Sequence, residues 1–279
     1  MNLIEIKGLC KNFPSFKLQN VDITLEEGFI MGFIGRNGAG KSTTIKTTLN
    51  LMNRDGGEVK LCGLSMPENE IEIKNQVGYV LGGVDFYPEA KISSITNVTK
   101  TFYKEWDEGL YKKLCDRFEI DQNKKFKQLS AGMKVKYSLA VAMSHNPKLL
   151  ILDEPTSGLD PAARDDLVLL FQEFIEDGKH SILFSTHITS DLEKCADYIT
   201  YIKQGQILAS ADKDSFRQSY ISVAGKKDQL SPEVQPKIIG LHEHQLGFEG
   251  IMKSEDKALA SAGGFEISEP SLEDIMIHI

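Results

Sequence analysis

The 279-residue sequence predicts an α/β fold built on a sheet of parallel strands. Two observations favour this fold. Short apolar runs recur along the chain, and segments with helical spacing lie between several of them. One of the densest apolar runs ends in glycine and precedes a helical pattern, which is typical of a buried strand that feeds a helix. With 41% hydrophobic and 26% charged residues, the composition is that of a globular chain.

The expected strands begin near the N-terminus. Residues 3–7 and 21–26 alternate apolar and polar positions, as half-buried strands do. Residues 29–34 form a continuous apolar run that predicts a buried strand, and a helix is expected from Lys41 to about Met52. Five more strand-like runs follow, at residues 58–62, 77–81, 149–152, 182–184 and 198–202.

A helical insertion is expected at residues 93–145, because no further buried strand interrupts this stretch and its apolar residues recur at helical spacing. Four aromatic residues in it are termed here the aromatic stripe. They are expected either to pack within the insertion or to form a groove for a helix of a membrane partner. The stripe comprises Phe102, Tyr103, Trp106 and Tyr111.

Two domains are predicted. Residues 1–210 form the main domain, with a helical subdomain at about residues 88–145. From there on, glycines punctuate short strand-like runs, and the chain ends in SLEDIMIHI, an amphipathic helical piece. Residues 211–279 are therefore expected to form a small C-terminal accessory module.

Charge and composition exclude several classes of protein. The chain has 32 basic and 40 acidic residues, a net charge of −8, and this balance argues against nucleic acid as a partner. No apolar run approaches the roughly 18 residues of a membrane span, and the N-terminal stretch lacks a signal cleavage site. The four cysteines are scattered without metal-ligand spacing, so they are expected to be reduced thiols. A cytoplasmic location is expected.

A phosphate-binding loop is indicated by GRNGAGKST, residues 35–43, between a predicted strand and a predicted helix. Its glycines allow backbone N–H groups to converge on the β- and γ-phosphates, and the helix N-terminus and Lys41 add positive charge. Ser42 is expected to coordinate Mg²⁺, and Thr43 to reach the α-phosphate. The candidate nucleotide-binding residues are Gly35, Asn37, Gly38, Ala39, Gly40, Lys41, Ser42 and Thr43.

Two carboxylates follow the apolar strand in LLILDEP, residues 149–155. The carboxyl ends of strands line the ligand crevice in α/β sheets, so both carboxylates are expected beside the phosphate loop. Asp153 is expected to hold the Mg²⁺ shell through water, and Glu154 to polarise the attacking water.

A second anion site is predicted at LSAGM, residues 129–133, just before a helical stretch. Ser130, Ala131 and Gly132 offer a hydroxyl and amide groups at a helix start. An ordinary helix cap is the alternative interpretation, and the position of this motif shortly upstream of LLILDEP favours the anion site.

In this order, GRNGAGKST, LSAGM, LLILDEP, TSGLD (residues 156–160) and STH (residues 185–187) resemble the nucleotide-binding subunit of ABC transporters. The resemblance covers about residues 1–205. It implies a P-loop NTPase core with an N-terminal β subdomain, the helical insertion and the small appendage, with ATP and Mg²⁺ as cofactors.

The same resemblance implies roles for three further residues. Asp160 belongs to the loop that communicates across a dimer, where Ser130, Ala131 and Gly132 face the nucleotide of the other chain. His187 contacts the γ-phosphate. Phe13 stacks on adenine, and Phe16 is a neighbouring candidate for that role.

The sequence departs from the family pattern at two places. LSAGM has Ala131 and Met133 where glycine and glutamine are usual, a variation that resembles the ABC-2 exporter branch. The glutamine that usually follows the strand at residues 77–81 is replaced by Gly82 and Gly83. Stretches such as GGVDFYP (residues 82–88) resemble ATPases that export amphipathic peptides such as phenol-soluble modulins, or that confer antimicrobial resistance.

The expected function is that of an ATP hydrolase that powers a separate membrane permease. Through this permease it is expected to lie on the inner face of the cell membrane as a peripheral subunit. It is expected to act as a homodimer or as a heterodimer with a related subunit. Export of a non-peptide cargo is an alternative, and so is a nucleotide-dependent regulator without turnover, suggested by the missing glutamine. A GTPase is disfavoured because NKKF, residues 123–126, lacks the aspartate of a guanine-reading motif.

Overall fold

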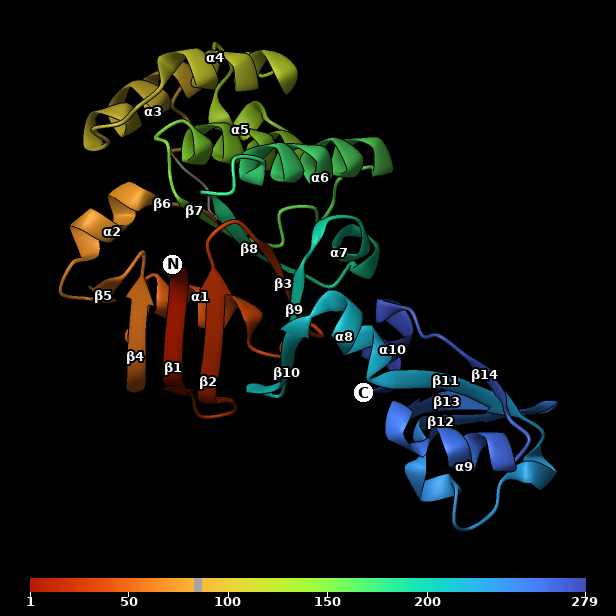
Figure 1. The fold of residues 1–279 in the computed structure, drawn as a ribbon. Helices are drawn as coiled ribbons and strands as arrows, with labels where there is room; N and C mark the ends of the chain where they lie inside the picture. Colours follow the sequence, from red (N-terminus) through yellow and green to blue (C-terminus); the bar gives the residue numbers. More distant parts are fainter. Residues whose placement is uncertain (83–86) are drawn as a thin grey trace. The chain divides into compact units, whose positions relative to one another are not determined.

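The computed structural model describes residues 1–82 and 87–279 and divides the chain into two compact units, residues 1–208 and 209–279. The first unit contains an antiparallel sheet of order β2-β1-β4-β5 and a second sheet of order β10-β9-β3-β8-β7-β6 (Figure 1). The strands of the first sheet are β1 (Asn2–Asn12), β2 (Lys17–Glu26), β4 (Gly56–Leu61) and β5 (Leu64–Met66). Those of the second are β3 (Ile30–Ile34), β6 (Val77–Val80), β7 (Leu149–Asp153), β8 (Ser181–Thr186), β9 (Tyr198–Lys203) and β10 (Gln206–Asp212).

The predicted parallel sheet is confirmed. Strands β9, β3, β8, β7 and β6 pair in parallel, and every residue of β3, β7 and β8 is buried. Continuous apolar runs are what parallel strands covered on both faces require. The helices of this unit are α1 (Lys41–Thr48), α2 (Glu70–Gln76), α3 (Ile92–Thr99), α4 (Glu108–Arg117), α5 (Ala131–Met143), α6 (Pro161–Ile175) and α7 (Thr189–Cys195).

Helices cover both faces of the parallel sheet. On one face, Ile45 of α1 belongs to a buried cluster that also contains Leu3 of β1 and Ile151 of β7, so α1 lies between the two sheets. On the other face, the ring of Phe171 in α6 lies 5.6 Å from that of Phe184 in β8. These layers place the start of α1 at the carboxyl edge of the strands, where the predicted site residues follow β7 and β8.

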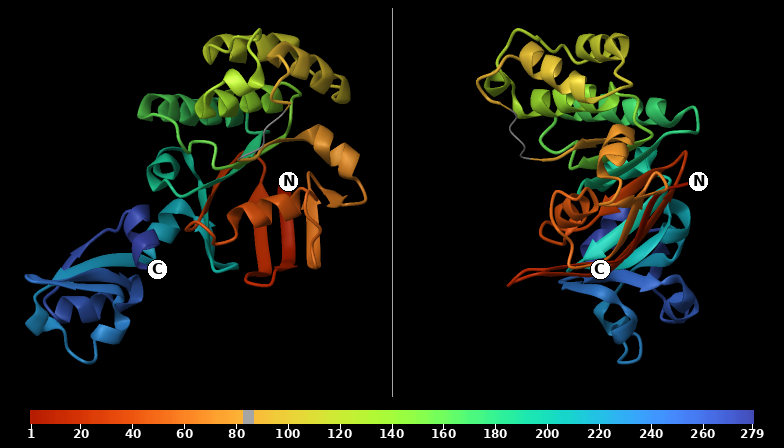
Figure 2. Two further views of the ribbon diagram at one scale, coloured as in Figure 1. Left: turned by 180° about the vertical axis from the view of Figure 1, so that it is seen from behind. Right: turned by 90° about the vertical axis from the view of Figure 1, so that its left-hand side faces the viewer.

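The helical insertion is formed by α3, α4 and α5 with two 3₁₀ turns, η1 (Lys100–Phe102) and η2 (Phe126–Gln128). These helices gather at one end of the first unit, next to α6 (Figure 2). In the insertion, the hydroxyl of Thr96 lies 2.8 Å from that of Tyr111 and 3.0 Å from that of Tyr137, all three buried. The polar tips of these tyrosines are therefore satisfied inside an otherwise apolar bundle.

The helical pattern expected across the aromatic stripe is interrupted, because residues 103–107 are not helical and separate η1 from α4. Phe102 is exposed, whereas Tyr103 stacks on His145 with the ring centroids 4.0 Å apart. The indole N–H of Trp106 donates to Glu108, and Tyr111 is buried. The rings of Trp106 and Tyr111 contact each other, with their centroids 5.4 Å apart, so part of the stripe packs within the insertion.

The second unit has its own small core beneath an antiparallel sheet of order β12-β13-β11-β14. A capping box lies at the N-terminus of its last helix, where Ser271 and Asp274 each accept a hydrogen bond from the other's backbone N–H. The elements are α8 (Lys213–Gln218), β11 (Tyr220–Gly225), η3 (Lys227–Gln229), η4 (Gln235–Lys237), β12 (Ile239–His244), β13 (Gly247–Lys253), η5 (Ser254–Asp256), α9 (Lys257–Ala262), β14 (Glu266–Ser268) and α10 (Leu272–His278).

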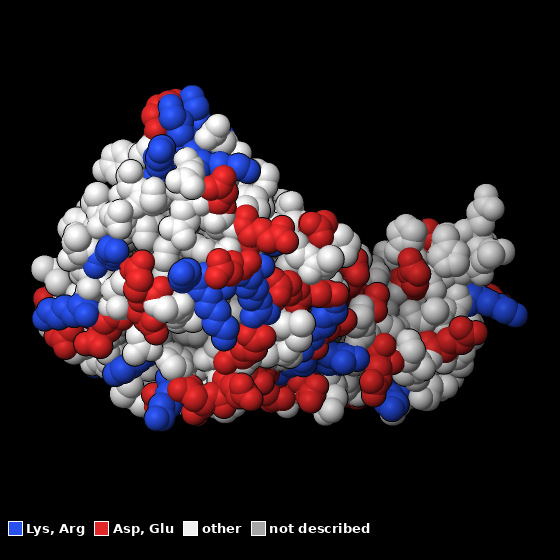
Figure 3. Space-filling model, turned by 90° about the horizontal axis from the view of Figure 1, so that it is seen from above, with Lys and Arg blue, Asp and Glu red and all other residues white. Residues whose placement is uncertain are grey.

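The surface has charges of both signs. On the face viewed in Figure 3, acidic and basic side chains are interspersed. Across residues 1–82 and 87–279, no helix combines the length and the apolar character needed to cross a bilayer.

Candidate functional site

The loop between β3 and α1 carries the predicted phosphate-binding motif. Gly40 precedes the first residue of α1 and has a φ of 117°, a conformation that side chains strongly disfavour. At Gly35, a Cβ atom would lie 2.4 Å from the carbonyl oxygen of Ile202 in β9. The loop therefore needs glycine at both positions, one for the turn into the helix and one for its close approach to β9.

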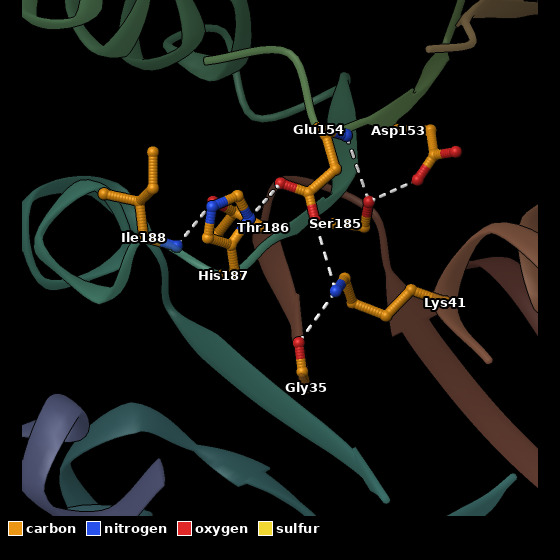
Figure 4. Close-up of polar contacts among 8 residues, drawn as sticks. All are labelled: Gly35, Lys41, Asp153, Glu154, Ser185, Thr186, His187 and Ile188. Carbon is orange, nitrogen blue, oxygen red and sulfur yellow. Dashed lines mark hydrogen bonds and ion pairs between the residues drawn. The ribbon is translucent and has the colours of Figure 1, made fainter. Parts of the chain in front are cut away.

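Lys41 begins α1 and is 5% exposed. Its Nζ donates to the carbonyl oxygen of Gly35 at 2.7 Å and forms an ion pair with Oε1 of Glu154 at 3.1 Å (Figure 4). A buried ammonium group requires such partners, because its desolvation is costly. The positive charge at the loop is thus held in place and balanced by Glu154, a partner that an anionic phosphate can replace.

Asp153 and Glu154 lie at the end of β7, beside Ser185 of β8. The parallel register pairs Asp153 with Ser185. The Ser185 hydroxyl donates to Oδ1 of Asp153 at 2.6 Å and accepts from the backbone N–H of Glu154 at 3.0 Å. One buried hydroxyl therefore orients both carboxylate residues. Sequence reasoning gave Ser185 no role, although a hydroxyl at the end of an apolar strand, level with Asp153, was a signal for it.

Glu154 has a φ of 53°, in the left-handed region that is strained for a residue other than glycine. Its Oε2 lies 2.7 Å from Nδ1 of His187, the residue that follows β8. Its other oxygen contacts Lys41. The structure thus brings three predicted site residues into direct contact, and strained backbone at functional sites is common.

A hollow of about 300 Å³ lies over the loop. The aromatic residue that lines it is Phe16, whose ring centroid lies 6.3 Å from that of Phe13; Phe13 is not among the lining residues. Gly35 and Ala39 also lie outside the lining. The residues around the hollow are Phe16, Arg36, Asn37, Gly38, Gly40, Lys41, Ser42, Thr43, Glu154, Ser157 and His187.

Comparison with known families matches residues 18–157 to the family described as ABC transporter, half of the chain. The chain belongs to the ABC transporter family. As an ABC ATPase it binds and hydrolyses ATP. The loop at residues 35–43 and the carboxylates at the end of β7 all lie within the matched segment.

Two curated relatives and one solved structure illustrate the match. The chain is 27% identical to the bacitracin transport ATP-binding protein BcrA of Bacillus licheniformis, over 99% of this chain and 97% of that protein. It is 30% identical to the lantibiotic transport ATP-binding protein SrtF of Streptococcus pyogenes, over 76% of this chain and 92% of that protein. A solved structure of an ATP-binding subunit of an ABC transporter superposes with a TM-score of 0.70 at 29% identity. The superposition covers 77% of this chain and 92% of that subunit.

The remaining predicted site residues of this ABC ATPase lie at two helix starts. The Ser130 hydroxyl accepts from the backbone N–H of Met133 at 3.2 Å and caps α5, which begins with Ala131 and Gly132. Asp160 caps α6 through the backbone N–H of Ala163 at 2.9 Å, and this bond holds the pKa of the Asp160 carboxyl below its usual value. Ser130, Ala131 and Asp160 are exposed, and none of the four lines the hollow.

Gly82 occupies the place of the usual glutamine, just after β6. A Cβ atom there would lie 3.6 Å from the carbonyl oxygen of Asp153, an ordinary contact distance. The position therefore lies beside the backbone of Asp153, and the described residues accommodate a Cβ atom there. Gly83, the other residue of that departure, lies outside the described residues.

We expect Ser185→Ala to lower ATP turnover about tenfold while ATP still binds, because Asp153 and the Glu154 backbone lose their shared partner. The lost hydrogen bonds should lower the free energy of unfolding by about 1–3 kcal/mol. Ser181→Ala is the matched control at the opposite end of β8, where the hydroxyl donates to the carbonyl of Glu26. It should cost similar stability and leave turnover unchanged. Steady-state hydrolysis and thermal unfolding measure both effects, and equal turnover in the two variants would contradict the role of Ser185.

Proposed function

We propose that the chain is the ATPase subunit of an exporter of amphipathic peptides or antimicrobials, acting through a separate membrane permease. The observation that supports hydrolysis is the contact of Glu154 with both Lys41 and His187 beside the phosphate loop. The peptide cargo is supported by the relatives named for bacitracin and lantibiotic transport.

In this proposal the loop amides and Lys41 bind the β- and γ-phosphates, and the triphosphate replaces Glu154 as the partner of Lys41. Glu154, once released, polarises the attacking water. His187 changes partner from Glu154 to the γ-phosphate. The change of partners needs no large rearrangement, because Glu154 and His187 both line the hollow above the loop.

Two oxygen donors suit Mg²⁺, which prefers carboxylate, hydroxyl and water ligands. Ser42 lines the hollow, and its hydroxyl makes no hydrogen bond within residues 1–82 and 87–279. The Ser185 hydroxyl donates to Oδ1 of Asp153. The other carboxylate oxygen of Asp153, Oδ2, makes no hydrogen bond within the described part of the chain. Bound between them, Mg²⁺ would neutralise phosphate charge. Ser185 would orient Asp153 toward it.

The proposed working form is a dimer of two such subunits, either two copies or one copy with a related chain. The exposed helix starts at Ser130, with Ala131 and Gly132, and at Asp160 are the groups that would meet the nucleotide of the other subunit. Phe13 or its neighbour Phe16 would stack on adenine.

We place the permease contact at an apolar groove of about 400 Å³ beside α5. Tyr103 and His145 stack face to face along it. Burial lowers the pKa of His145 to about 4, so the imidazole is neutral at pH 7 and fits an apolar helix. Leu81 lines the groove next to Gly82, which connects the permease contact to the site. The subunit would then be peripheral to the membrane on the cytoplasmic side.

We expect Tyr103→Ala to keep basal hydrolysis and to lose most permease-dependent stimulation, because it removes the ring that stacks on His145 in the groove. Trp106→Ala is the matched control, since Trp106 does not line the groove. The measurement is ATPase activity of the subunit alone and with the permease encoded next to it, reconstituted in vesicles. Full stimulation of the Tyr103 variant would reject this contact.

The same vesicles test the cargo. An amphipathic peptide should raise hydrolysis and accumulate in the lumen of inside-out vesicles, and a non-peptide lipid-like compound should not. If the lipid-like compound is transported and the peptide is not, the cargo is not a peptide. Absence of turnover with and without the permease would favour the nucleotide-dependent regulator.

A further inference from the structure

The helices α6 and α7 pack against each other, and Arg164 of α6 faces Asp191 of α7. Each lies within about one turn of a proposed site residue. The backbone N–H of Arg164 donates to the carbonyl oxygen of Asp160, the residue that caps α6. Asp191 lies in the first turn of α7, four positions after His187. A connection between these two side chains would therefore link the Asp160 turn to His187.

Asp191 is buried, Arg164 is partly exposed, and the two do not form a close ion pair. Nη1 of Arg164 lies 3.9 Å from Oδ1 of Asp191, and the two side chains are 26% and 3% exposed. Within the described residues, Nε of Arg164 and Oδ2 of Asp191 are buried and make no hydrogen bond. Buried charged groups are normally hydrogen-bonded to their partners, at about 2.8 Å for such a pair. The two charges thus attract each other across a gap that a small approach of the helices would close.

A second ion pair joins the same two helices and gives an internal comparison. Nζ of Lys194 lies 2.5 Å from Oδ1 of Asp165, and both side chains are more than half exposed. Exposed pairs contribute little to stability because water solvates and screens them. The pair of Arg164 and Asp191, which is less exposed and wider apart, is the one whose geometry can respond to a shift of either helix.

We propose that Arg164 and Asp191 are positioning residues that couple the Asp160 turn to His187. The inference rests on the proposed roles of those two residues. His187 is held by Glu154, 2.7 Å away, and must leave it to contact a phosphate. In this proposal a small shift of the start of α7 accompanies that change of partner. Closer approach of Arg164 and Asp191 would then stabilise the shifted position of α7 and transmit it to the Asp160 turn, where the second subunit is expected to bind.

The test compares variants of the pair in the full chain. Asp191→Asn should lower kcat about tenfold, while the Kd for ATP without Mg²⁺ stays within about twofold of the parent, because neither Arg164 nor Asp191 lines the hollow over the phosphate loop. Asp191→Glu should restore most of kcat, since one more methylene spans the gap to Arg164. Adding Arg164→Gln to Asp191→Asn should cost nothing further if both act through one contact. Asp165→Asn, the exposed control, should match the parent.

Each outcome separates this inference from the proposed function, with His187→Ala as the reference. Parent-like kcat in Asp191→Asn beside an inactive His187→Ala overturns the coupling and leaves the proposed function intact. Parent-like kcat in His187→Ala rejects the role of His187, and the coupling falls with it. A lower melting temperature of Asp191→Asn with unchanged kcat, or with equal loss of ATP binding, also overturns the coupling, because it identifies a structural role alone.

Discussion

Lys41→Ala is expected to weaken ATP binding by about a hundredfold or more, since it removes the buried positive charge of the loop, on a side chain that is 5% exposed. The loop amides and the helix start remain, so weak binding persists. Glu154 loses its partner as well, but it keeps its contact with His187. The fold should therefore survive, and isothermal titration with ATP measures the loss directly.

Lys46→Ala is the matched control for Lys41, because Lys46 belongs to the last turn of the same helix and does not line the hollow. Its affinity for ATP should equal that of the parent. Undiminished affinity in Lys41→Ala, with the same melting temperature as the control, would show that this loop does not bind the phosphates.

Glu154→Gln is expected to keep ATP binding and to reduce turnover by more than about a hundredfold, the usual scale for loss of a general base. The amide has the same shape as the carboxylate but lacks the charge that pairs with Lys41 and His187 in the structure. Without that competition, ATP should be held longer at Lys41. The result should be a dimer stabilised by ATP, which sedimentation with Mg²⁺ and ATP detects.

Glu176→Gln, an exposed carboxylate at the end of α6, is the control and should hydrolyse ATP at the parent rate. Parent-rate hydrolysis by Glu154→Gln would remove Glu154 from the reaction. An inactive variant that stays monomeric would assign Glu154 to hydrolysis and show that the two subunits need the permease to remain together.

Local patterns sufficed for much of the fold and the site. The loop at residues 35–43 depends on glycines, a strand and a helix that are contiguous in the chain. Asp153 and Glu154 follow an apolar run whose burial is evident from composition alone. Because the carboxyl ends of parallel strands meet at one edge, the approach of both carboxylates to the loop followed without coordinates.

The failures of prediction concern contacts between distant segments. Helical spacing suggested one aromatic face, but the chain leaves the helix after Phe102 and Tyr103 stacks on His145, 42 positions away. The spacing could not show this, because the partner that stabilises the break lies on another element. The adenine contact stays a prediction: Phe16 lines the hollow, and the ring of Phe13 lies 6.3 Å from that of Phe16.

The sequence alone determined which strand feeds the phosphate loop, which two carboxylates end β7 and which family the motifs resemble, because each depends on residues adjacent in the chain. Only the tertiary structure decided that Ser185 binds Asp153, that Glu154 joins Lys41 to His187, and that Arg164 faces Asp191. These contacts depend on the register of neighbouring strands and on how two helices pack. Register and packing are set by the whole buried core, which no single segment contains.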